Sequence, residues 1–463
     1  MVSVPVVPPE AADLPARRSI SFAVVTSAAV GLVLALVAGP PALAHPPGVT
    51  ERISVGPAGV AGDNDSLLAA VSADGRFVAF VSLASNLVPD DTNGTSDVFV
   101  RDRVTGTTER VSVNSRGRQS TGGDAGGVLD TNWGPPAISA DGRYVAFASS
   151  ATDLVKGDRN RVADVFVRDR LAGTTERVSV ASRKREANGE SSQPAISADG
   201  RFVAFASFAD NLVPDDTNFT SDVFVVDRTG GGPQRVSVSD TGQQGENRSE
   251  SPSISADGRF VAFMSSSDAL VPGDGDGASD VFVRDRAAAT TEGISVAPTS
   301  SGFGATSSSP AITPDGRFVA FDSWEPDLVP DDANNSFDVF VRDRATGGLE
   351  RVSVSSAGVE GNDWSLAPSI SSDGRFVAFH SFATNLVAGD GNFDFDVLVR
   401  DRMAGTTVRA SVRTDGTEGG LSLGSQNPSI SGNGLVVAFE SEADLVPADT
   451  GFPVDVFTHD EGA

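Results

Sequence analysis

Oxygen-bearing side chains recur along this chain in the pattern D-x-[DN]-x3-D, first met at Asp91, Asn93 and Asp97. Five further copies are Asp158, Asn160 and Asp164; Asp216, Asn218 and Asp222; Asp274, Asp276 and Asp280; Asp332, Asn334 and Asp338; and Asp390, Asn392 and Asp396. A seventh copy keeps Asp449 and Asp455 but has Gly451 between them. Hard cations such as calcium take about six to eight oxygen ligands, and closely spaced Asp and Asn side chains can supply part of such a shell. These residues are therefore candidate calcium ligands.

The same spacing also suits a purely structural role. Asp and Asn side chains hydrogen-bond to nearby backbone groups in Asx turns, which would set the entry of the chain into the next strand. Three side chains per loop are only part of a calcium shell, so the spacing leaves both interpretations open. No thiolate or histidine metal site is indicated, because the chain has no cysteine and its only histidines, His45, His380 and His459, form no cluster in the sequence.

A second group of candidates follows a phenylalanine that recurs in every repeat. The next position holds, in turn, Val81, Ala148, Ala206, Met264, Asp322, His380 and Glu440. Asp322, His380 and Glu440, near Trp324, are the candidate catalytic residues for acid–base chemistry. However, facing sheets stand about 10 Å apart, whereas a proton relay needs contacts of about 3 Å. A shared polar pocket or simple drift of surface residues is the alternative interpretation.

The formal net charge of −27 argues against nucleic acid or an anionic membrane surface as the partner, because both would be repelled. Cations and basic surfaces remain suitable. The sequence contains no nucleophile motif and no phosphate-binding glycine loop. The repeated R-D-R segments, such as Arg101-Asp102-Arg103, are expected to form a solvated charge ladder rather than an anion site.

These residues are carried by a repeat whose most regular part is SADGRFVAF at 72–80. Close copies occupy 139–147, 197–205, 255–263, 313–321, 371–379 and 431–439, the last being SGNGLVVAF. Seven copies at similar intervals indicate a repeat architecture, in which neighbouring units bury a common core. Residues 45–463 are therefore expected to form a single domain in spite of their number.

Each repeat contains four short apolar segments, which in the second repeat are 137–139, 144–147, 164–167 and 177–180. Segments rich in Val, Ile and Phe and separated by Gly, Asp and Asn predict strands. The middle two are apolar at nearly every position, which indicates strands covered on both faces. The first follows a proline and carries Ala or Ser, which suits an innermost strand near an axis. The predicted fold class is all-β, a seven-bladed β-propeller of four-stranded antiparallel blades.

The chain ends are predicted to close the ring. The seventh repeat stops at Asp455 to His459 and lacks the outermost ERVSV-type segment, whereas ERISV occurs at Glu51 to Val55, ahead of the first repeat. The N-terminal strand is therefore expected to complete blade seven, which would remove an open sheet edge.

The motif S-x-D-G-R-x-V-A-F, followed by D-V-F-V-R-D, resembles the WD40-like (PD40-type) repeat of TolB-like propeller proteins. The resemblance covers the chain after residue 44, and one copy, Thr313-Pro314-Asp315-Gly316, has the proline familiar from that family. It implies an extracytoplasmic propeller used mostly for binding. Residues 1–44 are expected to be cleaved as a signal peptide, and only six residues separate that cleavage site from Glu51. The separate α/β domain of TolB is therefore not expected here, and the partners of TolB are not carried over.

Loop lengths predict which face of the propeller carries function. The loops between second and third strands, and those from the fourth strand to the next blade, emerge together and are long; they form what we call the long-loop face. The Asp-Gly and R-D-R turns of the opposite face are short. Because long loops on a rigid scaffold commonly carry binding sites, we predict a non-enzymatic propeller that binds a protein, a peptide or a cell-envelope glycan on this face. A polysaccharide hydrolase or lyase with its site near the axial channel is the alternative.

The first 44 residues have the order of a secretory signal peptide: Arg17 and Arg18, an apolar run from Ile20 to Ala38, and Ala42-Leu43-Ala44 before a cleavage site at His45. A secreted or extracytoplasmic monomer is predicted, with no membrane span after cleavage. An uncleaved anchor is the alternative, because the apolar run is long enough to span a bilayer.

Overall fold

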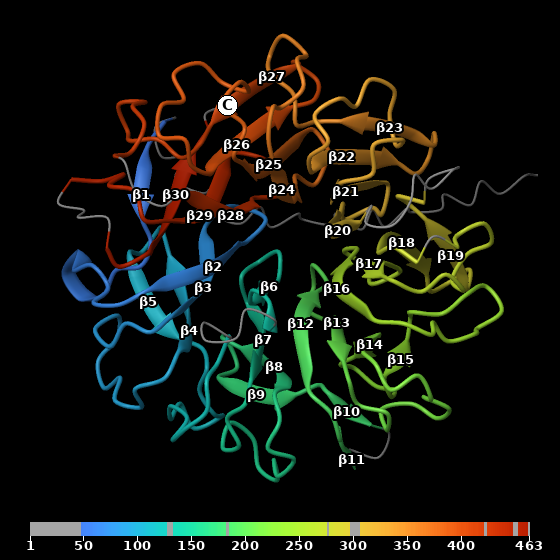
Figure 1. Cartoon of the computed structure of the whole chain (residues 1–463). Coiled ribbons are helices and arrows are strands. Elements are labelled where there is room, and N and C mark those ends of the chain that lie inside the picture. The colour runs from blue at the N-terminus through green and yellow to red at the C-terminus, as the bar shows by residue number, and fades with distance from the viewer. Residues whose placement is uncertain are drawn as a thin grey trace, which may run out of the picture. The chain divides into compact units, whose positions relative to one another are not determined.

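Each of the seven repeats folds into one four-stranded antiparallel sheet, and neighbouring sheets pack face to face around a closed ring (Figure 1). The computed structural model describes residues 48–126, 133–181, 185–275, 277–296, 306–420, 424–447 and 452–461. The predicted all-β, seven-bladed propeller is confirmed. Within these ranges the one helix is the 3-10 turn η1 (Pro57–Gly59), which is far too short to cross a membrane. The predicted signal peptide, residues 1–44, lies outside them.

Within each blade the strands follow one another from the axis outward, and the blades are numbered 1 to 7 in the order of the repeats. The innermost strands are β2 (Ser66–Val71), β6 (Ala137–Ile138), β12 (Ser191–Ile196), β16 (Ser249–Ile254), β20 (Ser307–Ile312), β24 (Ser365–Ile370) and β28 (Ser425–Ile430). The second strands are β3 (Phe77–Ser82), β7 (Tyr144–Ser149), β13 (Phe202–Ser207), β17 (Phe260–Ser265), β21 (Phe318–Ser323), β25 (Phe376–Ser381) and β29 (Val436–Ser441).

The third strands all begin and end with aspartate: β4 (Asp97–Asp102), β8 (Asp164–Asp169), β14 (Asp222–Asp227), β18 (Asp280–Asp285), β22 (Asp338–Asp343), β26 (Asp396–Asp401) and β30 (Asp455–Asp460). The outermost strands are β5 (Thr107–Arg110), β9 (Thr174–Arg177), β15 (Gln234–Arg235), β19 (Thr290–Gly293), β23 (Gly348–Arg351), β27 (Thr406–Arg409) and, in blade 7, β1 (Thr50–Arg52). A hairpin of β10 (Val180–Ala181) and β11 (Arg185–Glu186) lies between blades 2 and 3 in the sequence.

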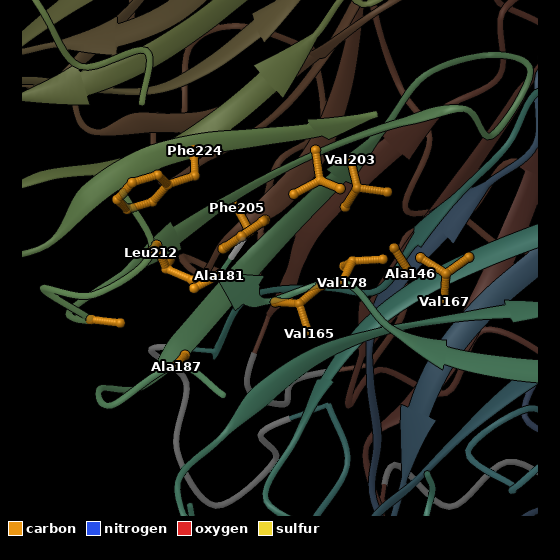
Figure 2. Packing of buried hydrophobic residues seen from close by; sticks show 12 residues of the cluster. Ala146, Val165, Val167, Val178, Ala181, Ala187, Val203, Phe205, Leu212 and Phe224 are labelled. Carbon is orange, nitrogen blue, oxygen red and sulfur yellow. The ribbon is translucent and has the colours of Figure 1, made fainter. Parts of the chain in front are cut away.

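The second and third strands form the core of each blade and are buried on both faces, as their continuous apolar runs predict. Phe80 of β3 and Phe99 of β4 stack with ring centroids 5.8 Å apart, and five further blades repeat this pair. Figure 2 shows how Val165 of blade 2 packs in one cluster with Val203 and Phe205 of blade 3. Apolar contact of this kind holds neighbouring blades together.

The innermost strands of every blade except blade 2 carry a β-bulge beside the axis. In β12 the register shifts between Ser192 and Ala195, and Gln193 within the bulge has a φ of 52°. The equivalent residues with positive φ in other blades are Leu68, Ser251, Ser309, Ala367 and Asn427. Because residues other than glycine seldom adopt this conformation, its repetition marks a specific inner-strand geometry. Figure 1 shows these strands gathered around the centre of the ring.

The Asp-Gly turns need glycine for two reasons. Gly200 has a φ of 72°, a conformation that glycine adopts freely. A Cβ at this position would also lie 2.1 Å from the ring of Tyr144 in the preceding blade. The turn is therefore part of the packing between blades as well as a reversal of the chain.

The R-D-R segments are not a solvated ladder, contrary to expectation. Asp102 is buried and accepts hydrogen bonds from Arg76 of its own blade at 3.0 and 2.7 Å. In the next blade, Arg170 reaches back to within 2.6 Å of Glu109 and 4.5 Å of the ring centroid of Phe77. Carboxylates and aromatic rings of the preceding blade replace the water around these arginines, so the segments link neighbouring blades.

The fourth strands end earlier than predicted. In blade 2 the strand ends at Arg177, where the predicted segment 177–180 begins. Blade 1 shows the reason: the backbone N–H of Val98 donates to the hydroxyl of Ser112 at 3.0 Å instead of to a backbone carbonyl. The serine of each V-S-V segment therefore ends the ladder with its side chain.

The predicted closure of the ring is confirmed. Strand β1 pairs antiparallel with β30, with Glu51 opposite Thr458. The N–H of Ile53 donates to the carbonyl of Val456 at 2.7 Å, and Ser54 takes the place of the serines in the other V-S-V segments. The strand itself is Thr50–Arg52 rather than Glu51 to Val55, for the same reason as in the other blades.

Candidate functional site

The last aspartate of each D-x-[DN]-x3-D group opens a third strand and is buried. In blade 1, Asp97 accepts hydrogen bonds from Asn93 Nδ2 at 2.8 Å, from Arg110 Nη1 at 3.1 Å and from the hydroxyl of Ser112. Asp91 lies 2.9 Å from the same Arg110 nitrogen. The three predicted residues therefore come together, but around a guanidinium group.

Five of the groups are ion-paired in this way with an arginine that ends the fourth strand. The pairs are Arg110 with Asp91 and Asp97, Arg177 with Asp158 and Asp164, Arg235 with Asp216 and Asp222, Arg351 with Asp332 and Asp338, and Arg409 with Asp390 and Asp396. In blade 7, Arg52 of β1 lies 3.2 Å from Asp455. These arginines were not predicted as partners of the acids, although E-R recurs before the V-S-V segments of the sequence.

Blade 4 departs from this arrangement, because Gly293 stands where the other blades have arginine. Its third-strand aspartate, Asp280, accepts a hydrogen bond from Ser295 at 2.7 Å. Asp274 precedes it in the same loop, and Asp276 lies outside the described residues.

The asparagines form the turns that the structural interpretation predicts. Oδ1 of Asn334 accepts a hydrogen bond from the N–H of Ser336 at 2.7 Å, and Asn392 does the same for Asp394 at 3.0 Å. These bonds two residues along the chain define Asx turns. Calcium binding by the same loops stays a prediction.

Blades 2, 5 and 6 add a third carboxylate to the group. In blade 2, Glu186 lies 3.1 Å from Arg177. Glu360 contacts Arg351, and Glu418 lies 2.7 Å from Arg409. In each set, Asp332, Asp338 and Glu360 or Asp390, Asp396 and Glu418, carboxylate oxygens lie within 4.8 Å of one another. Gln119 in blade 1 and Gln244 in blade 3 contact the corresponding loops through an amide instead.

Burial of these carboxylates changes their titration. Burial raises the pKa of Asp396 to about 7 in spite of the nearby Arg409. Burial together with the charge of Asp338 raises the pKa of Asp332 to about 7. Both sets place three acids around one guanidinium, so each has an excess of carboxylates over arginine.

The candidate catalytic residues Asp322, His380 and Glu440 each accept a hydrogen bond from the bulge of the next blade. Asp322 Oδ1 accepts from the N–H of Ala367 at 3.1 Å. His380 Nδ1 accepts from the N–H of Asn427 at 3.2 Å. Glu440 Oε2 accepts from the N–H of Leu68 at 2.7 Å. Their shared place in the repeat thus has a structural reason, since each satisfies a backbone donor that the bulge leaves without a ladder partner.

These three side chains do not form a direct proton relay in the described structure. Asn427 lies between two of them, because its Nδ2 donates to Glu440 Oε1 at 2.6 Å while its backbone N–H is bound to His380. Asp322 is held by Ser308 and Ala367. Burial lowers the pKa of His380 to about 4 and raises the pKa of Asp322 and of Glu440. The histidine is therefore neutral near pH 7 and suited to accept the bulge N–H.

A cavity of about 550 Å³ lies on the axis, between the innermost strands. The bulge residues line it, among them Gln193, Ser251 and Asn427, together with the prolines that follow them. Glu440 is the one candidate catalytic residue on its described wall.

Large aromatic side chains are exposed on one face of the described structure. They are Phe208, Phe219, Trp324, Trp364, Phe393 and Phe452, with exposed fractions between 47% and 89%. All lie between a second and a third strand or just before an innermost strand, and hence on the long-loop face. On the opposite face the exposed large apolar residues are aliphatic or methionine: Val104, Leu171 and Met403. The sequence analysis identified the face but missed the aromatics, which occupy variable positions of the repeat.

No protein-family model matches the sequence, and no curated protein matches it. Solved structures do match in fold. TolB from Acinetobacter baumannii is 15% identical, with a TM-score of 0.39 over 76% of this chain and 64% of that chain. An oligogalacturonate lyase from Vibrio parahaemolyticus is 13% identical, with a TM-score of 0.51 over 89% of this chain and 96% of that chain. A puromycin-hydrolyzing peptidase from Mycobacterium tuberculosis is 14% identical, with a TM-score of 0.53 over 90% of this chain and 55% of that chain.

These likenesses define the class of the protein as a β-propeller. TolB structures are among the matches, as the resemblance of the repeat motif led us to expect. Identities this low concern the fold alone, because one propeller can carry either binding or catalysis.

Proposed function

We propose that this protein is a secreted, non-enzymatic β-propeller that binds a protein, a peptide or a cell-envelope glycan on its long-loop face. The observation that carries the proposal is the placement of Phe208, Phe219, Trp324, Trp364, Phe393 and Phe452. Aromatic side chains give large contact areas at a low cost in conformational entropy, and they are enriched at binding sites. Their confinement to the loops of one face supports a binding surface there.

The alternative is a polysaccharide hydrolase or lyase that uses Asp322, His380 and Glu440. The bonds of these residues to bulge N–H groups favour a structural role for them. An enzyme should lose turnover when His380→Ala is made while the fold is retained. A binding protein has no turnover to lose.

The proposal can be tested by binding the protein to arrays of peptides and glycans. The double substitution Phe219→Ala with Phe393→Ala should weaken the strongest interaction, because both side chains are exposed on the long-loop face, by 89% and 71%. Leu171→Ala with Met403→Ala is the matched control, since these residues are exposed by 79% and 81% on the opposite face. Loss of binding in the control pair but not in the phenylalanine pair would contradict the proposal.

A further inference from the structure

Six aromatic residues lie on the long-loop face of blades 5 and 6, between their second and third strands or just before β24. We call this group the aromatic seam: Trp324, Phe337, Trp364, Phe382, Phe393 and Phe395. The rings of Trp324 and Phe337 are 5.7 Å apart between centroids, and those of Phe382 and Phe395 are 5.3 Å apart. Backbone hydrogen bonds connect the two pairs through Trp364 and its neighbour: Phe382 N–H donates to the Trp364 carbonyl, and Ser365 N–H to the Phe337 carbonyl, both at 2.8 Å.

The seam is rigid and yet accessible. Trp324 is fixed by a hydrogen bond from its indole N–H to the carbonyl of Asn335 at 3.0 Å. The exposed fractions are 47% for Trp324, 52% for Trp364 and 71% for Phe393. Aromatic groups that are already held in place lose little conformational entropy when a ligand binds. The seam therefore has the properties of a preformed contact surface.

The same two blades also carry acidic loops. Glu360 in blade 5 and Glu418 in blade 6 bring each group to three carboxylates around one arginine. Residues 322–338 and 380–396, which contain the loops between the second and third strands of blades 5 and 6, have no lysine or arginine. By contrast, the corresponding loop of blade 2 has Lys156, Arg159 and Arg161. Trp324 and Phe393 therefore lie in loops whose only charged side chains are acidic.

We propose that the aromatic seam binds a protein segment that carries arginine or lysine side chains. A cation over the face of Trp is attracted by the ring, and arginine can also stack on it. The flanking carboxylates favour the same ligand through Coulomb attraction, whereas an acidic segment would meet a net charge of −27. This inference rests on the proposed function, since it names the partner of the same face.

The inference is tested by calorimetric titration of the whole protein with three probes. The first is a capped peptide of alternating arginine and glycine, the second is the same peptide with glutamate in place of arginine, and the third is the hexamer of N-acetylglucosamine. Binding of the arginine peptide alone is expected, and it should weaken as salt is added. Tryptophan fluorescence should change with binding, because two of the three tryptophans, Trp324 and Trp364, lie in the seam.

Substitutions then locate the site. Trp324→Ala and Trp364→Ala should each weaken the affinity for the arginine peptide by roughly threefold to thirtyfold, as expected for loss of a cation–π contact. Met403→Ala is the control, since Met403 belongs to blade 6 but is exposed by 81% on the opposite face. Glu360→Gln and Glu418→Gln should weaken binding and reduce its salt dependence. Both variants should fold, because Gln119 and Gln244 serve in the corresponding places of blades 1 and 3.

Two outcomes would overturn the inference. One is equal binding of the arginine and glutamate peptides; the other is binding of the arginine peptide that Met403→Ala weakens and the two tryptophan substitutions do not. Tight binding of the neutral glycan, lost in Trp324→Ala, would overturn the choice of a cationic partner while leaving the proposed binding function in place. The proposed function itself would fail separately, if no ligand on the arrays depended on the long-loop face.

Discussion

At the scale of single residues, the buried acids of the long-loop face control how stability depends on pH. Burial raises the pKa of Asp396 to about 7, above the usual value near 4 that the unfolded chain has. Between about pH 4 and pH 7 the folded protein therefore holds a proton that the unfolded chain has lost. This contribution to the free energy of unfolding is present at acid pH and is lost as the pH rises through about 7.

We therefore expect Asp396→Asn to flatten the decrease in unfolding free energy between pH 5 and pH 8, by about 1 to 3 kcal/mol over the range. Urea unfolding at several pH values measures this. Asp169→Asn is the control, because the hydrogen bond from Arg143 holds the pKa of Asp169 at about 2, outside the range tested. An unchanged pH profile in Asp396→Asn would contradict the assignment.

Glu440 gives a second test at this scale, of the role assigned to the residues after the recurring phenylalanine. Glu440→Ala removes the acceptor for the N–H of Leu68 and for the side chain of Asn427. Leaving buried donors unsatisfied costs about 1 to 3 kcal/mol each. Urea unfolding should show this loss for Glu440→Ala and a smaller one for Glu440→Gln, whose amide oxygen can still accept one bond. Wild-type stability in Glu440→Ala would refute the structural role.

At the scale of elements, the sequence predicted the strands better than the contacts at their ends. Seven blades and their closure could be predicted from three features: the repeat period, the apolar runs of β3 and β4, and the additional strand near Glu51. In blade 2 the fourth strand was predicted at 177–180, later in the chain than the observed Thr174–Arg177, because Ser179 looks like a strand residue but ends the ladder with its hydroxyl. The spacing of the loop acids predicted correctly that they lie close together. It could not show that Arg110, from the following strand, contacts both Asp91 and Asp97.

The closure strand can be tested directly by removing residues 45–56. Without β1, strand β30 becomes an unpaired edge. We expect a lower melting temperature or concentration-dependent association, measured by calorimetry and light scattering. Removal of residues 45–47 alone should have no such effect, since β1 begins at Thr50. A truncated protein that is monomeric and has the melting temperature of the full protein would contradict the role of β1 in closing the ring.

The calcium prediction belongs to the long loops. Calcium is expected to raise the melting temperature more than magnesium does at equal ionic strength, because a bound ion stabilises the native state by mass action. The increase in melting temperature that calcium causes should be reduced more by Asp390→Asn than by Asp216→Asn. In blade 6 three carboxylates surround Arg409, whereas in blade 3 the amide of Gln244 hydrogen-bonds Asp216 at 2.7 Å. Equal responses to both cations would indicate general screening instead.

At the scale of the whole molecule, the two faces of the ring differ in how uniform their loops are. The Asp-Gly turns and R-D-R segments of one face bind blades to one another, and their residues repeat almost without change. The long loops of the other face share a framework of Asp, Asn and Arg but differ in the residues they expose. The sequence alone could predict this division, because the loops are long. It could not predict the aromatic seam, because the backbone next to Trp364 reaches Phe337 only when blade 6 packs on blade 5.

The most direct test of a binding long-loop face is hydrogen–deuterium exchange of the protein with and without its tightest ligand from the arrays. We predict slower exchange in the loops that precede β22 and β26, residues 325–337 and 383–395, and unchanged exchange in the Asp-Gly turns such as 73–76. Protection confined to the Asp-Gly turns or to the R-D-R segments would contradict the account, since the ligand would then occupy the face that holds the blades together.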